Sequence, residues 1–560
     1  MTLFSLVLVS KVFLVQIVHG GAYGEIANRQ YATQRGDIYE RGTVFFKRQD
    51  GQLVSAATQT TGFKLAIDPK TVTGSGNALN IEDIYQSLSA IVVLDHDDFM
   101  LRAGKTSDPY EEVATHLSKE QADAVSALKI SGINIFKEKW RFYPGGSLAS
   151  HALGLVAYRD NELGGRYGLE RQYDEELSRN ESDPYINFFA EVFSNLNKTL
   201  FDSSVREGDV VTTIEPEVQN FMERKLVEVK ERYQADSIGA IIMNPADGSI
   251  YAMGVKPDFD PNNFSQIKKT STFSNPLVEN VLEFGSVVKP LVMAAALDAG
   301  AVTALTTYND KGSIIVEKKE IFNFDKKARG VVNMQEVLNQ SLNTGMVFIE
   351  QKLGKEKMRD YLLAYGIKDK TGIDLPNETS GLVSNLNSPR EIEYANASFG
   401  QGIALTPIEM VRALASLGNG GNLVVPHVVE KIKYDDGTWK TFTYPTIPTK
   451  ITKKTGEEIT RMLVNVMDKS LKGGLAKLER FSVAIKTGTA QVANPTDGGY
   501  YEDKHTHSFV GYFPAYDPKF IVFLYALDPK GVQYAAETWA DPFLDITKFL
   551  LNYYEVAPDR

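Results

Sequence analysis

Residues 237–254 read SIGAIIMNPADGSIYAMG, residues 481–492 read FSVAIKTGTAQV, and residues 508–527 read SFVGYFPAYDPKFIVFLYAL. In the first stretch two apolar, β-prone runs flank Asn244–Gly248, which has typical turn residues, so it predicts a β-hairpin. The two later stretches also read as strands. Because strands lie at both ends of this half of the chain and helical patterns lie between them, we predict an α+β fold, in which helices cover the faces of an antiparallel sheet.

A helix is predicted directly before the hairpin. Thr213–Glu215 are suited to cap it, and its apolar positions recur at helical spacing. These positions are Val218, Phe221, Leu226 and Val229. Residues 205–209 (VREGD) read as a linker turn before this region.

The part of the chain from Tyr31 to about Ser204 has a mixed pattern. A β-like run lies at Phe63–Ile67 and a helical stretch at Leu117–Leu128, with several Gly and Pro breaks. Nothing in this part has the spacing of a catalytic site. We therefore expect it to be a non-catalytic α/β domain.

Composition excludes several classes of protein. The chain has 560 residues, of which 43% are hydrophobic and 23% charged, as in a folded chain of two to four domains. The net charge of −11 argues against a nucleic-acid-binding protein, which needs a cationic face. Cysteine is absent, which excludes disulfides and thiol nucleophiles. The seven histidines are scattered, with only His505 and His507 close together, so we expect no metal site.

The N-terminus contains an apolar run, Thr2–Val18, which is near the lower length limit of a membrane span. Lys11 lies in its middle. We favour an uncleaved membrane anchor whose cytoplasmic end is missing from this chain. A signal peptide cleaved near Gly20–Ala22 and a buried core helix are the alternatives, although no positive segment precedes the run.

The first chemical motif is Ser286-Val287-Val288-Lys289, which leads into an apolar, Ala-rich helix pattern. A serine and a lysine three residues apart lie on one face of a helix, about one turn from each other. The first turn of a helix stabilises negative charge, and a buried lysine has a lowered pKa. This arrangement therefore suits a serine nucleophile with an amine as its base. A second copy, Ser265 to Lys268, lies in a polar stretch and reads as a solvated loop.

Two further motifs follow in the sequence. The first is Ser341-Leu342-Asn343, for which a polar helix end or inter-helix loop is the alternative interpretation. The second is Lys486-Thr487-Gly488-Thr489, which lies inside a strand-like run, where its glycine lets a substrate backbone approach the strand edge.

Lys-Thr-Gly also occurs at two other places. Lys370 leads into a loop with a proline, whereas Lys454 starts a helix for which Thr455 and Glu458 read as a capping box. Ser286, Ser341 and Lys486 therefore form one ordered set of motifs, which is typical of β-lactamases and penicillin-binding proteins.

With these motifs the chain resembles the class B penicillin-binding proteins, which are peptidoglycan D,D-transpeptidases. The resemblance implies a membrane anchor at 1–18, an elongated, mixed α/β pedestal (dimerisation-type) domain at 19–205 and a transpeptidase domain at 206–560. There are two departures: the family usually has Pro-Gly where this chain has Phe284-Gly285, and it usually has Asp-Arg-Asn-Gly where this chain has Glu40-Arg41-Gly42. The remaining pieces that carry the resemblance are RGDIYER (35–41), RFYP (141–144) with His151 and Gly154, GLE (168–170) with Tyr173, NPADG (244–248), ASFGQG (397–402), Thr406-Pro407, NGG (419–421) and SFVG (508–511).

The resemblance also implies a mechanism. Ser286 would attack the penultimate D-alanine of a stem peptide and form an acyl-enzyme, with Lys289 as the proton acceptor. Ser341 would relay a proton to the leaving amine, Lys486 would keep the local field positive, and Asn343 would bind a donor carbonyl.

Substrate binding is implied for the remaining motif residues. The hydroxyls of Thr487 and Thr489 would hold the substrate carboxylate alongside Gly488, and the N–H groups of Ser286 and Thr489 would form the oxyanion hole. No cofactor is needed. β-Lactams would acylate the same serine, and a separate membrane glycosyltransferase of the SEDS type would polymerise the glycan, in division or elongation.

Two other functions remain open from the sequence. The first is a β-lactamase or D,D-carboxypeptidase, which would hydrolyse the acyl-enzyme instead of transferring it. The second is a catalytically inactive scaffold or β-lactam sensor. The complete motif set argues against the scaffold, and the large N-terminal region argues against a β-lactamase.

Overall fold

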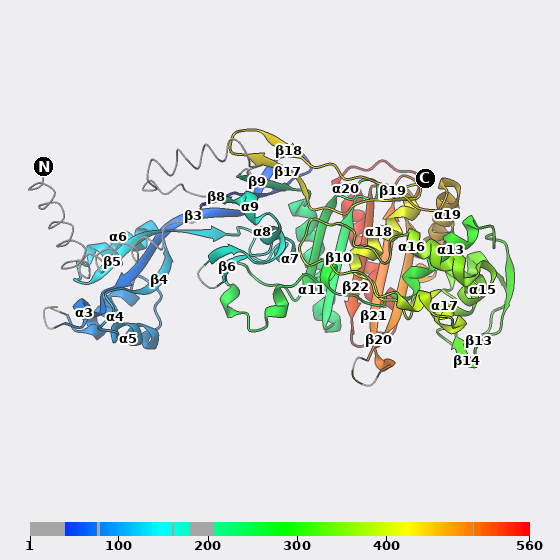
Figure 1. The fold of residues 1–560 in the computed structure, drawn as a ribbon, viewed down its shortest axis with the longest axis horizontal. Helices are drawn as coiled ribbons and strands as arrows, with labels where there is room; N and C mark the ends of the chain where they lie inside the picture. The colour runs from blue at the N-terminus through cyan, green and yellow to red at the C-terminus, as the bar shows by residue number, and fades with distance from the viewer. Residues whose placement is uncertain (1–39, 75–78, 160–161, 180–206, 495, 497) are drawn as a thin grey trace, which may run out of the picture. The chain divides into compact units, whose positions relative to one another are not determined.

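The computed structural model describes residues 40–74, 79–159, 162–179, 207–494, 496 and 498–560 (Figure 1). The chain forms two compact units. The described residues of the first unit are 40–41, 58–74, 79–142 and 178–179, and the second unit contains the others. The expected anchor at 1–18 and the expected boundary at 205/206 lie outside the described residues, so these domain limits stay predictions.

The first unit is a small α/β unit around strand β3 (Leu53–Ile67), which enters it at Thr58. β3 pairs antiparallel with β5 (Ile133–Phe142) and β4 (Glu111–Leu117). The predicted strand at 63–67 is thereby confirmed, as is the helix at 117–128, which is α6 (Lys119–Ala127). The remaining elements are α3 (Pro69–Val72), α4 (Ile81–Ser89), α5 (His96–Ala103), β1 (Glu40–Arg41) and β8 (Ser178–Arg179).

In the second unit, β9 (Gly208–Thr212) pairs antiparallel with β17 (Val429–Tyr434) and parallel with β2 (Val44–Lys47). The predicted linker turn is therefore wrong at Gly208 and Asp209, which begin β9. The strand starts this early because Val210 and Val211 are fully buried and the Asp209 carboxylate accepts a hydrogen bond from the Thr43 N–H at 2.8 Å.

The main sheet of the second unit has the order β11-β10-β22-β21-β20, and all its pairs are antiparallel (Figure 1). The predicted hairpin is confirmed as β10 (Ser237–Met243) and β11 (Ile250–Lys256). The strands from the end of the chain, β20 (Ala484–Ala493), β21 (Tyr500–Phe513) and β22 (Phe520–Leu527), join it as expected. β20, which carries Lys486–Thr489, is an edge strand.

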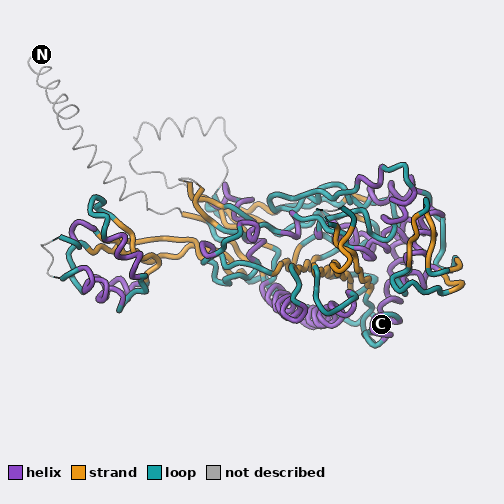
Figure 2. The backbone as a smooth tube through the Cα atoms, turned by 90° about the horizontal axis from the view of Figure 1, so that it is seen from below, coloured by secondary structure: helices purple, strands orange, loops and turns teal. Residues whose placement is uncertain are grey.

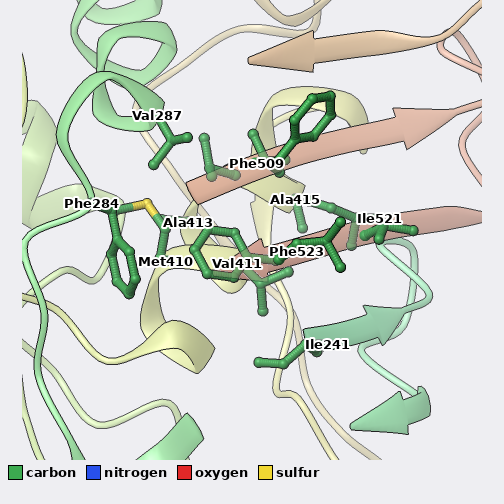
Figure 3. Packing of buried hydrophobic residues seen from close by; sticks show 14 of the residues in the cluster. Ile241, Phe284, Val287, Met410, Val411, Ala413, Ala415, Phe509, Ile521 and Phe523 are labelled. Atoms are coloured by element: carbon green, nitrogen blue, oxygen red, sulfur yellow. The ribbon is translucent and has the colours of Figure 1, made fainter. Parts of the chain in front are cut away.

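Helices cover both faces of this sheet, because successive side chains of a strand point to opposite faces and β22 is buried at all but its last position. The predicted helix is α11 (Pro216–Tyr233), which packs with α20 (Ala535–Tyr553) against the sheet, and Glu215 caps it. Figure 2 shows helices lying against the strands of this unit. α18 (Pro407–Gly418) also packs against β10, β21 and β22. There, Phe284 and Val411 lie among Phe509 and Phe523 (Figure 3).

No described helix has the length and hydropathy needed to cross a membrane. The second unit also contains further helices and strands. These elements are α7 (Ser150–Leu153), β6 (Val156–Arg159), β7 (Glu162–Gly165), α8 (Gly168–Gln172), α9 (Asp174–Leu177), η2 (Phe264–Gln266), η3 (Thr270–Phe273), α12 (Pro276–Glu279), η4 (Gly285–Val288), α13 (Lys289–Asp298), β12 (Thr307–Asp310), β13 (Ser313–Val316), β14 (Lys319–Phe322), β15 (Gly330–Asn333), α14 (Met334–Asn339), α15 (Asn343–Leu353), α16 (Lys355–Ala364), η5 (Ser384–Asn387), α17 (Glu391–Ala397), β16 (Asn422–Leu423), β18 (Trp439–Thr441), β19 (Ile447–Pro448), α19 (Lys453–Lys469) and η6 (Leu471–Gly474).

Candidate active site

Ser286 lies in the first turn of the predicted helix, which begins as the 3₁₀ turn η4 and continues as α13. The N–H of Lys289 donates to the carbonyl of Ser286. Phe284, directly before this turn, is buried and packs edge-on against Phe523, with 5.1 Å between the ring centres. The Ser508 hydroxyl donates to the Phe284 carbonyl at 2.8 Å. The core and the sheet therefore fix the position of the Ser286 backbone.

Strand β20 runs directly beside the Ser286 turn. A Cβ atom on Gly488 would lie 2.3 Å from the Phe284 carbonyl oxygen, so only glycine permits this approach. Gly285, at φ +61°, approaches the Thr489 carbonyl in the same way, because a Cβ there would lie 3.0 Å from that oxygen. We predicted that Gly488 lets a substrate approach, whereas here it accommodates the chain's own Phe284–Ser286 segment.

Two buried lysines converge on Ser341. Lys289 Nζ lies 2.6 Å from the Ser341 carbonyl oxygen, 3.3 Å from Ser341 Oγ and 2.8 Å from Asn343 Oδ1. Lys486 Nζ, from β20, lies 3.0 Å from Ser341 Oγ and 2.8 Å from the Thr487 carbonyl oxygen. The three motifs are distant in sequence, and they meet at the Ser341 hydroxyl, which lies between two amines.

Burial changes the acid–base properties of both lysines. Burial, together with the neighbouring charge of Lys486, holds the pKa of Lys289 well below its usual range. Burial alone lowers the pKa of Lys486 to about 7. No carboxylate among the described residues forms a hydrogen bond or ion pair with either amine. A neutral amine, which can accept a proton, is therefore available near neutral pH.

The Ser286 hydroxyl is half-buried and makes no hydrogen bond to any residue that the structure describes. Lys289 Nζ is instead bonded to the turn at 341–343. Catalytic hydrogen bonds are often loose without substrate and tighten in the complex. The Ser286 hydroxyl oxygen thus has no hydrogen-bond partner among the described residues, and Lys289, which carries the buried amine, follows it by one helical turn.

Ser341 occupies the tight turn that joins α14 to α15. Its φ of 54° is in the left-handed region, which is unfavourable for a serine. The N–H of Leu342 closes the end of α14 by donating to the Val337 carbonyl at 3.0 Å. The alternative interpretation, an inter-helix loop, is thus correct as a description of the backbone, and the same loop presents Ser341 and Asn343 to the lysines.

The side chains of Thr487 and Thr489 lie half-buried on the edge strand β20. Thr489 Oγ1 accepts a hydrogen bond from the Ala535 N–H at 3.1 Å, so the start of α20 is tied to this strand. An edge strand presents backbone groups that an extended peptide can pair with. The roles of Thr487, Gly488 and Thr489 in substrate binding stay predictions.

The other motif copies lie away from this arrangement. Ser265 and Lys268 are exposed, and Thr371 lies in a loop where its hydroxyl donates to Glu378. Lys454 lies in the first turn of α19 as expected, but the predicted capping box is wrong. The cap is Thr452, whose Oγ1 accepts from the Thr455 N–H at 3.3 Å, because Asp298 also orients both hydroxyls.

The histidine pair does not form a metal site. His507 is buried and its Nδ1 lies 2.8 Å from Thr538 Oγ1, and burial lowers its pKa to about 4. Within the described ranges, no group of three or more His, Asp or Glu side chains is arranged to hold a metal.

One pair near Ser286 is not indicated by the sequence patterns. The Tyr500 hydroxyl donates to the Glu283 carboxylate at 3.0 Å, and burial raises the pKa of Glu283. Glu283 precedes Ser286 by three residues, which was the only signal for it. The partner could not be predicted, because Tyr500 lies 217 residues away.

Comparison with known proteins places this arrangement in a family. Residues 238–547 match the penicillin binding protein transpeptidase domain, and residues 30–190 match the penicillin-binding protein dimerisation domain. Stage V sporulation protein D of Bacillus subtilis is 33% identical over 76% of this chain and 66% of its own length. Peptidoglycan D,D-transpeptidase FtsI of Escherichia coli K12 is 25% identical over 97% of this chain and 87% of its own length.

Solved structures show the same fold. Penicillin binding protein 2X from Streptococcus thermophilus has a TM-score of 0.71 with 21% identity, covering 93% of this chain and 80% of that one. Penicillin binding protein 3 of Mycobacterium tuberculosis, complexed with aztreonam, has a TM-score of 0.69 with 21% identity, over 93% of this chain and 98% of that one. The fold shared with these solved structures agrees with the two matched family models. The chain belongs to the class B penicillin-binding proteins.

Proposed function

We propose that this protein is a serine-type peptidoglycan D,D-transpeptidase that cross-links stem peptides through an acyl-enzyme on Ser286. One observation carries the proposal: two buried amines, Lys289 and Lys486, meet at Ser341 beside the Ser286 turn, and no carboxylate of the described residues compensates them. Relatives named peptidoglycan D,D-transpeptidase support it.

Acylation begins when Ser286 Oγ attacks the carbonyl carbon of the penultimate D-alanine, while the neutral Lys289 amine accepts the hydroxyl proton. The resulting oxyanion is held by the N–H groups of Ser286 and Thr489, each worth about 2.7–4 kcal/mol in the transition state. The C–N bond then breaks. Ser341 passes a proton to the leaving amine, and the terminal D-alanine departs.

Transfer reverses this chemistry with a different amine. An amine of a neighbouring stem peptide attacks the ester carbon, loses its proton to the site, and releases Ser286 as the new amide forms. Asn343 binds a donor carbonyl, Lys486 keeps the field positive, and the hydroxyls of Thr487 and Thr489 hold the substrate carboxylate. The residues that perform these steps need no metal or organic cofactor.

The working environment follows from the proposed substrate. We infer that an N-terminal helix anchors the chain in the bacterial cytoplasmic membrane, with the bulk of the protein outside the cytoplasm. A membrane glycosyltransferase of the SEDS type supplies the glycan strands that this enzyme cross-links. β-Lactams acylate the same serine because they mimic the peptide's end.

A fluorescent penicillin tests the proposal directly. The wild-type chain should take one covalent label, and the Ser286→Ala variant should take none. A label that turns over rapidly would indicate a β-lactamase or carboxypeptidase. A wild-type chain without a Ser286-dependent label would indicate a scaffold and overturn the proposal.

A further inference from the structure

A buried polar cluster lies directly behind the Ser341–Asn343 turn. Asp310 and Asn323 are each 1% exposed, and Thr344 is 3% exposed. Asn323 Nδ2 donates to both carboxylate oxygens of Asp310 at 3.0 Å, and Thr344 Oγ1 donates to Asp310 at 2.8 Å. The N–H groups of Gly312 and Arg329 also donate to this carboxylate, at 3.0 and 2.9 Å. A buried carboxylate that accepts hydrogen bonds from so many donors has a fixed position, and it also fixes the positions of the donor groups.

This cluster caps the helix that carries Asn343. The residue before α15 is Leu342, whose side chain cannot accept a hydrogen bond from the helix start. Instead the Thr344 N–H donates to Asn323 Oδ1 at 3.2 Å. Asn343 Nδ2 donates to the Phe322 carbonyl at 2.9 Å, which leaves Asn343 Oδ1 directed at Lys289. Two successive residues, 322 and 323, thus hold the first turn of α15.

The same segment also holds the other side of the turn. Arg329 Nε donates to Gln340 Oε1 at 3.0 Å, and Gln340 directly precedes Ser341. Arg329 is itself fixed by Asp325, at 2.8 Å. The left-handed Ser341 is therefore held on both flanks by residues 307–333, which we call the clamp segment (β12 to β15). A strained turn persists where its surroundings determine it in this way.

We propose that Asp310 and Asn323 are positioning residues, which act through Thr344 and α15 to hold Asn343 against Lys289 and so align the amine for acylation. This inference rests on the proposed function. Loss of the outer partners that orient metal ligands typically costs about 10- to 100-fold in activity. We expect an effect of the same order for the partners that orient Asn343 and Lys289. Because Asn343 also binds a donor carbonyl in the proposed function, loss of the cluster should slow the acylation step strongly and weaken the initial, non-covalent binding of a penicillin by a smaller factor.

The test compares Thr344→Val with Thr344→Ser in the full chain, by stopped-flow measurement of acylation with a fluorescent penicillin. Thr344→Val removes the hydroxyl that bonds Asp310, whereas serine keeps it. Asp310→Asn is measured in parallel, so that a folding failure of one variant does not decide the result. The matched control is Thr460→Val, because Thr460 is similarly buried at 2% exposure and, among the described residues, its hydroxyl bonds only Tyr512, at 2.8 Å.

We expect Thr344→Val and Asp310→Asn to label completely, with the first-order acylation constant lowered about 10- to 100-fold and the initial binding weakened by a smaller factor. Thr344→Ser and Thr460→Val should acylate like the wild type. A smaller labelled fraction that reacts at the wild-type rate would mean that the cluster has a purely structural role, and this would overturn the inference. Wild-type kinetics in both variants would also overturn it. If the wild type itself takes no Ser286-dependent label, the proposed function fails first.

Discussion

Two lysine amines define this site, because both are fully buried and no acid among the described residues is paired with them. Burying an unpaired charge is strongly unfavourable, so such groups lose their proton instead. Lys289 and Lys486 share Ser341 Oγ as a partner, at 3.3 and 3.0 Å. Burial disfavours the charge of both lysines, and the charge of Lys486 further disfavours that of Lys289, which leaves a base one helical turn from Ser286 at neutral pH. The chemistry of the site follows from this pair.

The first prediction concerns the pH dependence of acylation. A protonated amine cannot accept the Ser286 proton, so the acylation rate should rise with pH and level off above the pKa of the base. The charge of Lys486 lowers the pKa of Lys289, so Lys486→Met should raise that pKa and move the acidic limb of the residual rate to higher pH. Penicillin acylation measured from pH 5 to pH 9 checks this, and a shift to lower pH would contradict it.

The second prediction concerns stability. The pKa of Lys486 falls from 10.5 to about 7 on folding, so between these values the unfolded chain binds more protons and stability rises with pH. Below pH 7 the folded protein bears the full cost of the buried charge. Lys486→Met should therefore stabilise the chain by about 1–4 kcal/mol at pH 6, and by less at pH 9.5. Urea unfolding at both pH values measures this, and an equal gain at both would refute the explanation.

At the scale of elements, the site depends on the contact between the η4 turn and the edge strand β20. Gly488 and Gly285 let the two backbones approach, and Ser508 bonds the strand pair to the Phe284 carbonyl. Position 284, where the family usually has proline, here holds a phenylalanine that anchors the turn in the core. The spacing of the nucleophile and the strand is thus set by packing.

The third prediction tests this contact with Gly488→Ala. The added Cβ would lie 2.3 Å from the Phe284 carbonyl and 2.4 Å from Ser508 Oγ, so the strand must move away from the nucleophile. Acylation should fall at least about tenfold, because small misplacements are costly in catalysis.

The control for this prediction is Gly254→Ala on β11 of the same sheet. Its Cβ would meet only side-chain atoms, the nearest at 3.2 Å, so acylation should stay unchanged. Equal losses in both variants would show that a general disturbance of the sheet, rather than the η4 contact, is responsible.

The sequence predicted the motifs of the site and their helices and strands better than the side-chain contacts between them. The order and context of Ser286, Ser341 and Lys486 selected the copies of three common motifs that the folded chain brings together, because strand and helix patterns differ locally. The Asp310–Asn323 cluster was not predictable, since it depends on side chains that meet only in the folded protein. The cap at Thr452 was missed for a similar reason, because Asp298 from another helix determines it.

At the scale of the whole molecule, part of the N-terminal half folds with the transpeptidase half. Residues 143–177 belong to the second unit. The buried Glu223 carboxylate, on α11, accepts from the Ala149 N–H at 2.8 Å and from Lys256 Nζ at 2.9 Å. Three distant segments therefore share one buried network and one core.

The fourth prediction is that Glu223→Gln destabilises the second unit strongly. Breaking a buried ion pair from one side costs about 3–5 kcal/mol, because it leaves the partner charge uncompensated. Asp258, the other partner of Lys256, should reduce this cost toward the lower end. Glu228→Gln on the same helix breaks an exposed pair with Lys225 and should cost less than about 1 kcal/mol. Urea unfolding compares them, and similar losses would contradict the role of the network.

The most direct test of the central claim uses a donor that ends in D-alanyl-D-alanine, followed by intact-protein mass spectrometry. We predict an acyl adduct on Ser286 with release of D-alanine, and a faster loss of this adduct when a D-amino acid is added as acceptor, with formation of the new amide. An adduct that hydrolyses at the same rate with or without the amine, or none on Ser286, would contradict the account.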